Sequence, residues 1–386
     1  MNTVSVYIHI PFCKKKCNYC DFVSFADKEE LIDGYVEALK HEITSIPQQL
    51  KIKTIFFGGG TPSLLAPKQL EKILSHFESR ITYPEISIEC NPGTVNLQKL
   101  KDFHKLGINR LSIGAQSFND RELKTLGRIH TAKEIHETVE NARKAGFKNV
   151  GLDLIFALPN QTLESWKETV RKAVELEPEH LSTYNLQIEE GTPFWKMTND
   201  KPCLTAGRFQ MSNNNFQLPD EETEACMYEF AIDYLKAKGY KHYEISNFSK
   251  PGYECKHNIV YWKNGDYIGI GVNAASHINN SRHENPNNFE EYFLMANQQS
   301  KGLAGKLASR PARDEISETI MMNLRLLDGL SKKEFKERFG KDIEELYKKE
   351  IDELEKDNLI ENTKTHLKLS RKGLFLANLI FEKFVD

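Results

Sequence analysis

The stretch that decides the fold is Tyr7-Ile8-His9-Ile10-Pro11-Phe12-Cys13-Lys14-Lys15-Lys16-Cys17-Asn18-Tyr19-Cys20-Asp21-Phe22. It places three cysteines at the spacing C-x3-C-x2-C directly after an apolar, strand-like run. The loop is short enough to wrap three thiolates around one soft metal centre, and thiolates favour zinc, copper(I) or iron–sulfur clusters. No second cysteine or histidine pair supplies the fourth ligand that zinc usually takes. The pattern favours a cluster with one open iron, with a structural zinc loop or three reduced thiols as the alternative.

The composition indicates a large cytoplasmic protein. The chain has 386 residues, of which 39% are hydrophobic and 28% charged, with a formal net charge of -3. This length predicts one large domain with one or two smaller ones, and the near-neutral charge argues against a nucleic-acid partner. Seven cysteines, three of them at the start, do not make a disulfide framework. No leader pattern and no apolar run of about 18 residues is present, so we expect neither a signal peptide nor a membrane span.

Apolar strands and amphipathic helices alternate six times between residue 4 and about residue 188. The strands are short and continuously apolar, as expected of strands buried on both faces. They are predicted at Val4–Ile10, Thr54–Phe57, Glu85–Cys90, Arg110–Ala115, Val150–Ala157 and Leu181–Leu186. Six successive units predict an α/β fold with a parallel sheet, either an incomplete (β/α)6 barrel or an open doubly wound sheet. In both arrangements functional residues lie at the carboxyl ends of the strands.

Polar residues occur at or near these strand ends. A glycine-rich turn, Gly58-Gly59-Gly60-Thr61-Pro62, follows the second strand and allows close approach of a ligand to the backbone. Glu89 and Gln116 end the third and fourth strands, and Asp153 lies inside the fifth. A carboxylate in an apolar strand needs a partner, and Arg128 is a candidate cation for it.

The cysteine spacing, with Tyr19 directly before the last cysteine, resembles that of the radical S-adenosylmethionine (SAM) enzymes. In that superfamily SAM chelates the open iron of a 4Fe–4S cluster, and an electron from the cluster cleaves SAM to a radical. The resemblance implies that Cys13, Cys17 and Cys20 hold such a cluster, and it favours the partial barrel over the open sheet.

The polar set resembles one branch of this superfamily more closely, the oxygen-independent coproporphyrinogen III dehydrogenases and the related HemW-type haem chaperones. Glu89, Gln116, Arg128 and Asp153 match its SAM-contacting positions in order and local context. The resemblance implies that Gln116, Arg128 and Asp153 line the place where the dehydrogenase binds a second SAM. It implies that the cluster-bound SAM is held by Tyr7, Tyr19, Gly59, Gly60, Thr61, Pro62 and Glu89.

The remainder of the chain does not continue the alternation of strands and helices. We expect residues 1–195 to form the barrel, 196–310 a β-containing extension and 311–386 a helical domain. The extension is predicted to be β-rich at Tyr240–Phe248, Cys255–Trp262 and Tyr267–Gly271. The tail shows helices, a short hairpin at Leu359–Leu369 and a final helix at Lys372–Phe384, a pattern that resembles a winged helix. Its mixed charges favour packing or a protein partner over DNA.

Two features separate the chaperones from the dehydrogenases in this branch. The segment Cys20-Asp21-Phe22 lacks the further cysteine that would make a C-x-C ending, which the dehydrogenase pattern calls for. The segment His257-Asn258-x-x-Tyr261-Trp262 matches the HNxxYW motif associated with the chaperones. An imidazole is a good axial ligand for haem iron, and both aromatic residues could contact the macrocycle. Cys255 is an alternative thiolate ligand, and the competing interpretation is that His257 caps a turn while the aromatic residues are core.

The sequence therefore predicts a haem chaperone with a 4Fe–4S cluster, SAM and haem as cofactors, which passes haem to an apoprotein such as a respiratory-chain component. Two other classes stay open: a coproporphyrinogen III dehydrogenase, and a binding module whose cluster is only structural. The sequence does not decide whether SAM is cleaved. A homodimer and a peripheral membrane contact also stay open.

Overall fold

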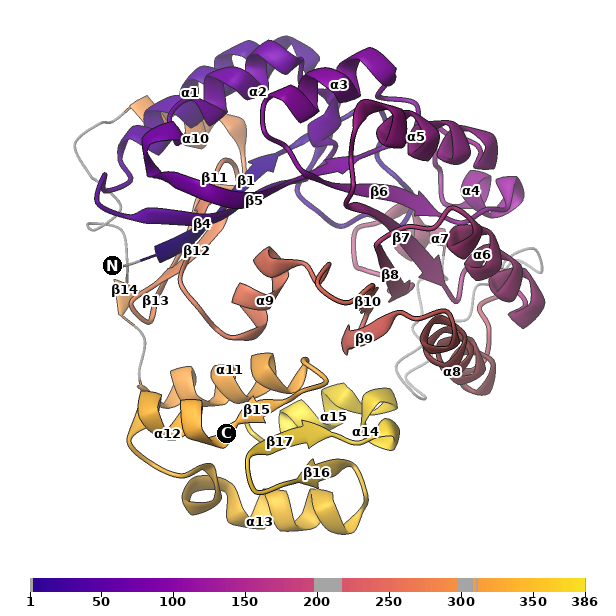
Figure 1. The fold of residues 1–386 in the computed structure, drawn as a ribbon, viewed down its shortest axis with the longest axis vertical. Helices are drawn as coiled ribbons and strands as arrows, with labels where there is room; N and C mark the ends of the chain where they lie inside the picture. The colour runs from indigo at the N-terminus through magenta and orange to yellow at the C-terminus, as the bar shows by residue number, and fades with distance from the viewer. Residues whose placement is uncertain (1–2, 198–216, 298–307, 310–311, 386) are drawn as a thin grey trace.

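The computed structural model describes residues 3–197, 217–297, 308–309 and 312–385 (Figure 1). Most of the predicted polar connector, Met197–Gln217, lies outside the described residues. The described part holds a twelve-stranded sheet, a three-stranded sheet near the C-terminus and a two-stranded pair at the cysteine loop. In Figure 1 the large sheet arches, with helices covering its outer side.

Six strands at the centre of the large sheet pair in parallel and in chain order, which confirms the predicted βα units. They are β1 (Thr3–Ile10), β4 (Lys51–Gly59), β5 (Ile81–Cys90), β6 (Arg110–Gln116), β7 (Val150–Phe156) and β8 (His180–Asn185). The helices between them are α1 (Ile32–Thr44), α2 (Pro67–Leu74), α3 (Leu97–Lys105), α4 (Asp120–Thr125), α5 (Ala132–Ala145) and α6 (Leu163–Glu175). Helix α5 shows why the boundaries fall where they do. Thr131 and Glu134 form a capping box at its start, and Gly146 ends it in the left-handed conformation.

The extension adds strands to both edges of this sheet. On one side β11 (Tyr267–Ile270) pairs in parallel with β1, followed by β12 (Ala275–Ile278), β13 (Ser281–Glu284) and β14 (Ala308–Ser309). On the other side β10 (Asn247–Ser249) and β9 (Lys241–Glu244) follow β8. Among the described residues, the sheet order ends at β14 and at β9 without pairing between them. The barrel is therefore incomplete, as expected.

Short elements complete this part of the fold. The cysteine loop contains β2 (Phe12–Cys13), paired with β3 (Phe25–Ala26). Single 3₁₀ turns lie at Glu29–Leu31, Pro62–Leu64 and Glu78–Arg80. The remaining helices are α7 (Pro193–Met197), α8 (Glu221–Ala237), α9 (Lys256–Trp262) and α10 (Phe289–Asn297).

Helix α9 corrects the expectation that Cys255–Trp262 is β-structure. The run Ile259-Val260 favours a strand locally, but the two carboxylate oxygens of Glu85 accept hydrogen bonds from the amides of Lys256 and His257, at 3.4 and 3.2 Å. A carboxylate at a helix start satisfies free amides and interacts favourably with the helix dipole. This partner lies some 170 residues upstream, where a local pattern cannot reveal it.

The C-terminal part has the predicted winged-helix-like order. It comprises α11 (Ala312–Leu324), β15 (Leu330–Ser331), α12 (Lys332–Phe339), α13 (Ile343–Lys356), β16 (Ile360–Asn362), β17 (His366–Leu369), α14 (Arg371–Phe375) and α15 (Ala377–Glu382). Strands β16 and β17 form the expected hairpin. The expected final helix divides because the backbone at Leu376 leaves the helical region. This part has a hydrophobic core of its own.

A buried carboxylate ties α1 to the extension. Glu42, 6% exposed, accepts hydrogen bonds from the Gly271 amide at 2.9 Å, the Asn285 side-chain amide at 2.7 Å and the Tyr292 hydroxyl at 2.7 Å. These donors lie more than 220 residues further along the chain. The carboxylate therefore fixes the edge of the sheet beside β1.

We expect Glu42→Ala to lower the free energy of unfolding by about 2–4 kcal/mol, because three buried donors lose their acceptor. Chemical denaturation followed by circular dichroism measures the change. Glu37→Ala, on the same helix but with a half-exposed side chain paired to Lys40 and Lys72, should change stability by less than about 1 kcal/mol. Equal effects of the two substitutions would show that the network does not hold the edge.

Candidate cofactor site

A cavity of about 570 Å³ opens at the carboxyl ends of the parallel strands. Every predicted cluster and cofactor residue lines it except Pro62, which is buried in the 3₁₀ turn after Thr61. The predicted residues that line it are Tyr7, Cys13, Cys17, Tyr19, Cys20, Gly59, Gly60, Thr61, Glu89, Gln116, Arg128, Asp153 and His257. The cavity brings the first 20 residues of the chain together with helix α9, more than 230 residues later.

The cysteine loop is held at both ends by backbone hydrogen bonds. The Gly60 amide donates to the carbonyl of Ile10 at 2.9 Å, where the loop leaves β1. Further along, the backbone amide of Asn18 donates to Leu126 at 2.9 Å and its side chain donates to Thr125 at 2.9 Å. The loop is thus fixed against the ends of β4 and α4, although it has little regular structure of its own.

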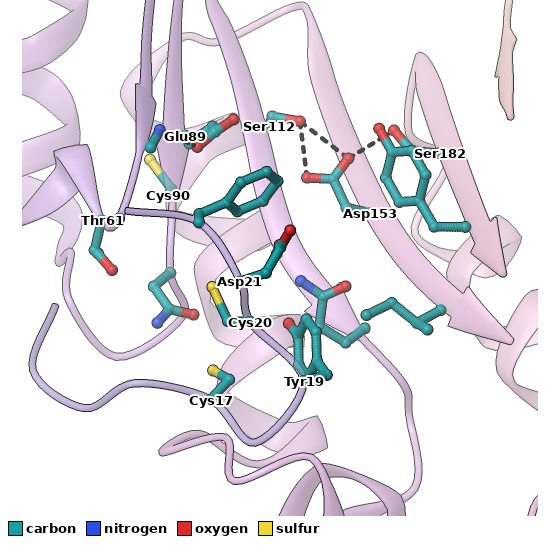
Figure 2. Close-up of a pocket in the computed structure, with 18 of the residues that line it drawn as sticks. Cys17, Tyr19, Cys20, Asp21, Thr61, Glu89, Cys90, Ser112, Asp153 and Ser182 are labelled. Carbon is teal, nitrogen blue, oxygen red and sulfur yellow. Dashed lines mark hydrogen bonds between the residues drawn. The ribbon is translucent and has the colours of Figure 1, made fainter. Parts of the chain in front are cut away.

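The three cysteines are half-buried free thiols, and polar side chains lie near the sulfurs of two of them. The Thr61 hydroxyl lies 3.6 Å from the Cys13 sulfur, and a guanidinium nitrogen of Arg128 lies 3.6 Å from the Cys17 sulfur. Burial raises the pKa of Cys20 to about 11, so an empty loop keeps this thiol protonated. A metal must displace such protons, which makes its binding pH-dependent. Figure 2 shows Cys17 and Cys20 together on the loop at the cavity.

These residues fit a cluster held by three thiolates. A Cβ atom on Gly60 would lie 2.7 Å from the Phe12 carbonyl and 3.0 Å from the Cys13 sulfur, so only glycine permits this approach of the two loops. Hydroxyl and guanidinium donors lie near two of the sulfurs, as hydrogen-bond donors do around metal-bound thiolates.

Glu89 presents a buried carboxyl group to the cavity. One of its oxygens accepts a hydrogen bond from the Gly59 amide at 3.1 Å. Burial, with the nearby charge of Asp153, raises its pKa to about 8. The carboxyl group is therefore suited to a ligand that carries positive charge, because such a ligand compensates the cost of ionising it.

Asp153 is held differently from the expectation. Its partners are the Ser112 hydroxyl, at 2.9 and 3.1 Å, and the Ser182 hydroxyl at 2.6 Å (Figure 2). Arg128 instead donates to the Gly114 carbonyl at 2.7 Å and to Asn91, and faces the cysteine loop. The predicted Arg128–Asp153 pair is therefore wrong. Two serine hydroxyls satisfy the carboxyl group without a cation in contact.

His257 lies in the cavity wall with both ring nitrogens engaged. The Thr54 hydroxyl donates to Ser5, so it accepts from the Nδ1–H of His257, at 2.7 Å. The Nε2 lone pair then accepts from the Tyr261 hydroxyl at 2.8 Å. The ring is 1% exposed and stacks on Phe56 at 5.2 Å. Burial lowers its pKa to about 3, so the imidazole is neutral.

Two neighbours of His257 depart from their expected roles. Trp262 does not line the cavity, and the Arg325 guanidinium covers its ring at 4.7 Å. Its expected contact with a haem face is therefore absent from this arrangement. Cys255 lines the cavity, but it is buried with its sulfur 3.8 Å from a Glu85 oxygen, and burial raises its pKa to about 12. Its thiol is a poor source of thiolate.

Sequence reasoning missed Ser112, Ser182 and Thr54 as members of this site. All three are polar residues inside predicted apolar strands, and Asp153 stands directly opposite Ser182 in the register of β7 and β8. An aligned pair of polar residues on adjacent strands was the signal that could have identified Ser182, whereas Ser112 stands opposite Gly151 and gave no such signal. Thr54 gave no such signal, because its partner His257 comes from outside the barrel units.

Comparisons with known proteins agree with this geometry. The family signature of the radical SAM superfamily matches residues 7–173, and that of the HemN C-terminal domain matches residues 311–376. The heme chaperone HemW of Lactococcus lactis is 37% identical over 384 residues, which cover 99% of this chain and 97% of the relative. HemW of Bacillus subtilis is 36% identical over 391 residues, 99% of each chain. The solved structure of coproporphyrinogen III oxidase (HemN) from Escherichia coli, described as a radical SAM enzyme, superposes on this chain with a TM-score of 0.82 at 23% identity. The match covers 99% of this chain and 90% of that one, which shows that the two share a fold.

The fold and the cysteine loop therefore define a radical SAM protein, a class that implies a 4Fe–4S cluster and SAM. Within that class the chain belongs to the heme chaperone HemW family. In the described part of the chain, no helix is long and apolar enough to cross a membrane.

The raised pKa of Glu89 predicts that the free energy of unfolding of protein without cluster or SAM depends on pH. Because the folded-state pKa of about 8 lies above the unfolded value of about 4.3, the folded state is favoured below pH 4.3 and progressively loses this stability as the pH rises toward 8. We expect Glu89→Gln to stabilise cluster-free, SAM-free protein by on the order of 3–4 kcal/mol more at pH 8 than at pH 5.

Denaturant titrations at the two pH values measure this difference. Glu71→Gln, on an exposed position of α2, is the control and should shift stability equally at both. Parallel pH profiles for wild type and Glu89→Gln would contradict the assignment.

Proposed function

We propose that this protein binds haem, passes it to an acceptor apoprotein, and holds a SAM-bound 4Fe–4S cluster in the same cavity. The observation that carries the proposal is that the three cysteines and His257 of the HNxxYW motif line one cavity. The heme chaperone relatives, similar over nearly the whole length, support the extension of haem delivery to this chain. A respiratory-chain component is a candidate acceptor.

In this proposal Cys13, Cys17 and Cys20 hold the cluster, which when bound supplies an open iron that SAM chelates. Glu89 receives the SAM amino group, since its carboxyl group is buried and already oriented by the Gly59 amide. Tyr7, Tyr19 and Gly59 to Thr61 line the same cavity, and Pro62 is buried in the turn that follows Thr61. Gln116, Arg128 and Asp153 line the adjoining part, where the related dehydrogenases take a second SAM.

His257 is the proposed haem ligand. The Thr54 hydroxyl accepts the Nδ1–H and so keeps the other nitrogen, Nε2, as the one with a lone pair. That lone pair accepts from the Tyr261 hydroxyl in this structure and would be the one offered to haem iron. Haem binding by this route exchanges one hydrogen bond for one coordinate bond. The hydroxyl of Tyr261 therefore orients the imidazole and also competes with iron for the Nε2 lone pair.

A cluster on free thiols requires a reducing compartment, and we place this function in the cytoplasm. All the cysteines in the described part of the chain are free. Cys90 and Cys255 are also buried, so their thiols are shielded from oxidation.

We expect His257→Ala to weaken haem binding about tenfold or more and to alter the Soret band, because the axial nitrogen is lost. Tyr261→Phe should bind haem more tightly than wild type, because Nε2 no longer has a competing donor. Titration followed by absorbance measures both, with the exposed His41→Ala as the matched control. Unchanged haem affinity and spectrum in His257→Ala would overturn ligation by this residue.

The alternative function is oxidative decarboxylation of coproporphyrinogen III. The assay is anaerobic: protein with a reconstituted cluster is mixed with SAM, a strong reductant and coproporphyrinogen III, and products are separated by chromatography. We expect no product from protein that binds haem stoichiometrically, because the C-x-C cysteine is replaced by Phe22. The Escherichia coli coproporphyrinogen III oxidase, run in parallel, shows that the assay works. Product over many turnovers would replace the chaperone with an enzyme.

A further inference from the structure

A second group of potential metal ligands lies outside the cysteine cavity, where α11 packs against the edge of the large sheet. His277 on β12 and Glu315 and Glu318 on α11 bring one ligand atom each within 4.8 Å of one another. His277 is 1% exposed and Glu315 is 5% exposed. None of the three lines the cavity that holds the cysteines.

The imidazole of His277 is oriented as in metal sites. Its Nδ1 lies 3.0 Å from the carbonyl of Gly265, which can only accept, so Nδ1 carries the proton. The lone pair of Nε2 then points into the group, buried and without a hydrogen-bond partner. A carboxylate oxygen of Glu315 lies 3.6 Å away. Two acceptors that face each other in a buried place call for a positive charge between them, either a proton on Nε2 or a metal ion.

The two carboxylates are held by side chains on their far sides. Arg338 and the Asn264 amide engage one oxygen of Glu315, which leaves the other facing His277. Arg282 engages both oxygens of Glu318, at 2.8 and 3.1 Å. Such outer partners orient the ligands of metal sites. His277 Nε2 has no hydrogen-bond partner and is the atom that an ion at this place would satisfy.

We propose that His277, Glu315 and Glu318 bind one divalent transition-metal ion, for which zinc is the best fit. One imidazole and two carboxylates form a donor set that zinc accepts, with water as a fourth ligand. Ligand atoms around zinc lie about 3.3 Å apart when the bonds are about 2.0–2.1 Å. The three ligand atoms lie within 4.8 Å of one another, so they must approach by up to about 1.5 Å to bind zinc.

Such an ion would join the C-terminal domain to the sheet beside the haem motif. The ring of His277 contacts Tyr267 at 6.2 Å, Tyr267 contacts Tyr261 at 4.5 Å, and Tyr261 contacts His257 at 5.0 Å between ring centroids. The ion therefore supports the packing behind the haem motif without lying in the cavity.

The test uses the full chain with Cys13→Ser, Cys17→Ser and Cys20→Ser, so that the cluster cysteines do not take up metal. This protein is treated with a chelator and titrated with Zn²⁺ and with Co²⁺. We expect one equivalent of zinc to bind and to raise the Tm. Cobalt at this site should show d–d bands without the charge-transfer band of a thiolate ligand.

His277→Gln and Glu318→Gln should each weaken zinc binding by roughly a hundredfold and abolish the Tm shift. The exposed His136→Gln should leave both unchanged. Glu318 is only half-buried, so its substitution keeps the test valid if His277→Gln does not fold. Absence of zinc binding in the parent protein would overturn the proposal and leave an ion-pair network. Equal zinc affinity in parent and Glu318→Gln would also overturn it.

Discussion

The hydrogen bond from the Gly60 amide to the Ile10 carbonyl is the constraint on which the site depends. It draws the turn after β4 against the start of the cysteine loop, at a separation that excludes any Cβ atom on Gly60. A loop with three cysteines has few backbone partners of its own, so neighbouring strand ends must supply them. Because the loop is fixed in this way, its sulfurs share one cavity with Glu89 and with the helix that carries His257.

Burial gives this cavity a consistent electrostatic character. It raises the pKa of Cys20 and of Glu89 and lowers that of His257, so all three groups favour their neutral forms in the empty protein. A metal or a cationic ligand reverses this preference at the first two groups by compensating their charge. The neutral imidazole, in contrast, is already the form that ligates iron. Binding of a metal at Cys20 or of a cationic ligand at Glu89 therefore releases a proton, whereas ligation by His257 does not.

The local sequence pattern was sufficient to predict the barrel strands, but it was insufficient to predict which side chains contact one another inside the barrel. The six buried strands were predictable because continuous apolar runs separated by amphipathic helices have few other solutions. Helix α9 was not predictable in this way, because its first amides are bonded by Glu85, which lies on a strand far away in the sequence. The hydrogen-bond partners of Asp153 were also not predictable, because the choice between Arg128 and two serines depends on the direction of the side chains. Motif resemblance identified the residues that line the cavity, whereas their contacts needed the three-dimensional arrangement.

The parallel pairing of β1 with β11 has a consequence for how the protein is made. Strand β1 leads into the cysteine loop, and Ser5 pairs with Tyr267, some 260 residues later. On the ribosome, the strand emerges early and remains an open sheet edge until more than two-thirds of the chain has been synthesised. Closing so long a loop is slow, and it completes the wall that includes α9. A ribosome stalled before β11 would therefore display the cysteine loop beside an incomplete sheet.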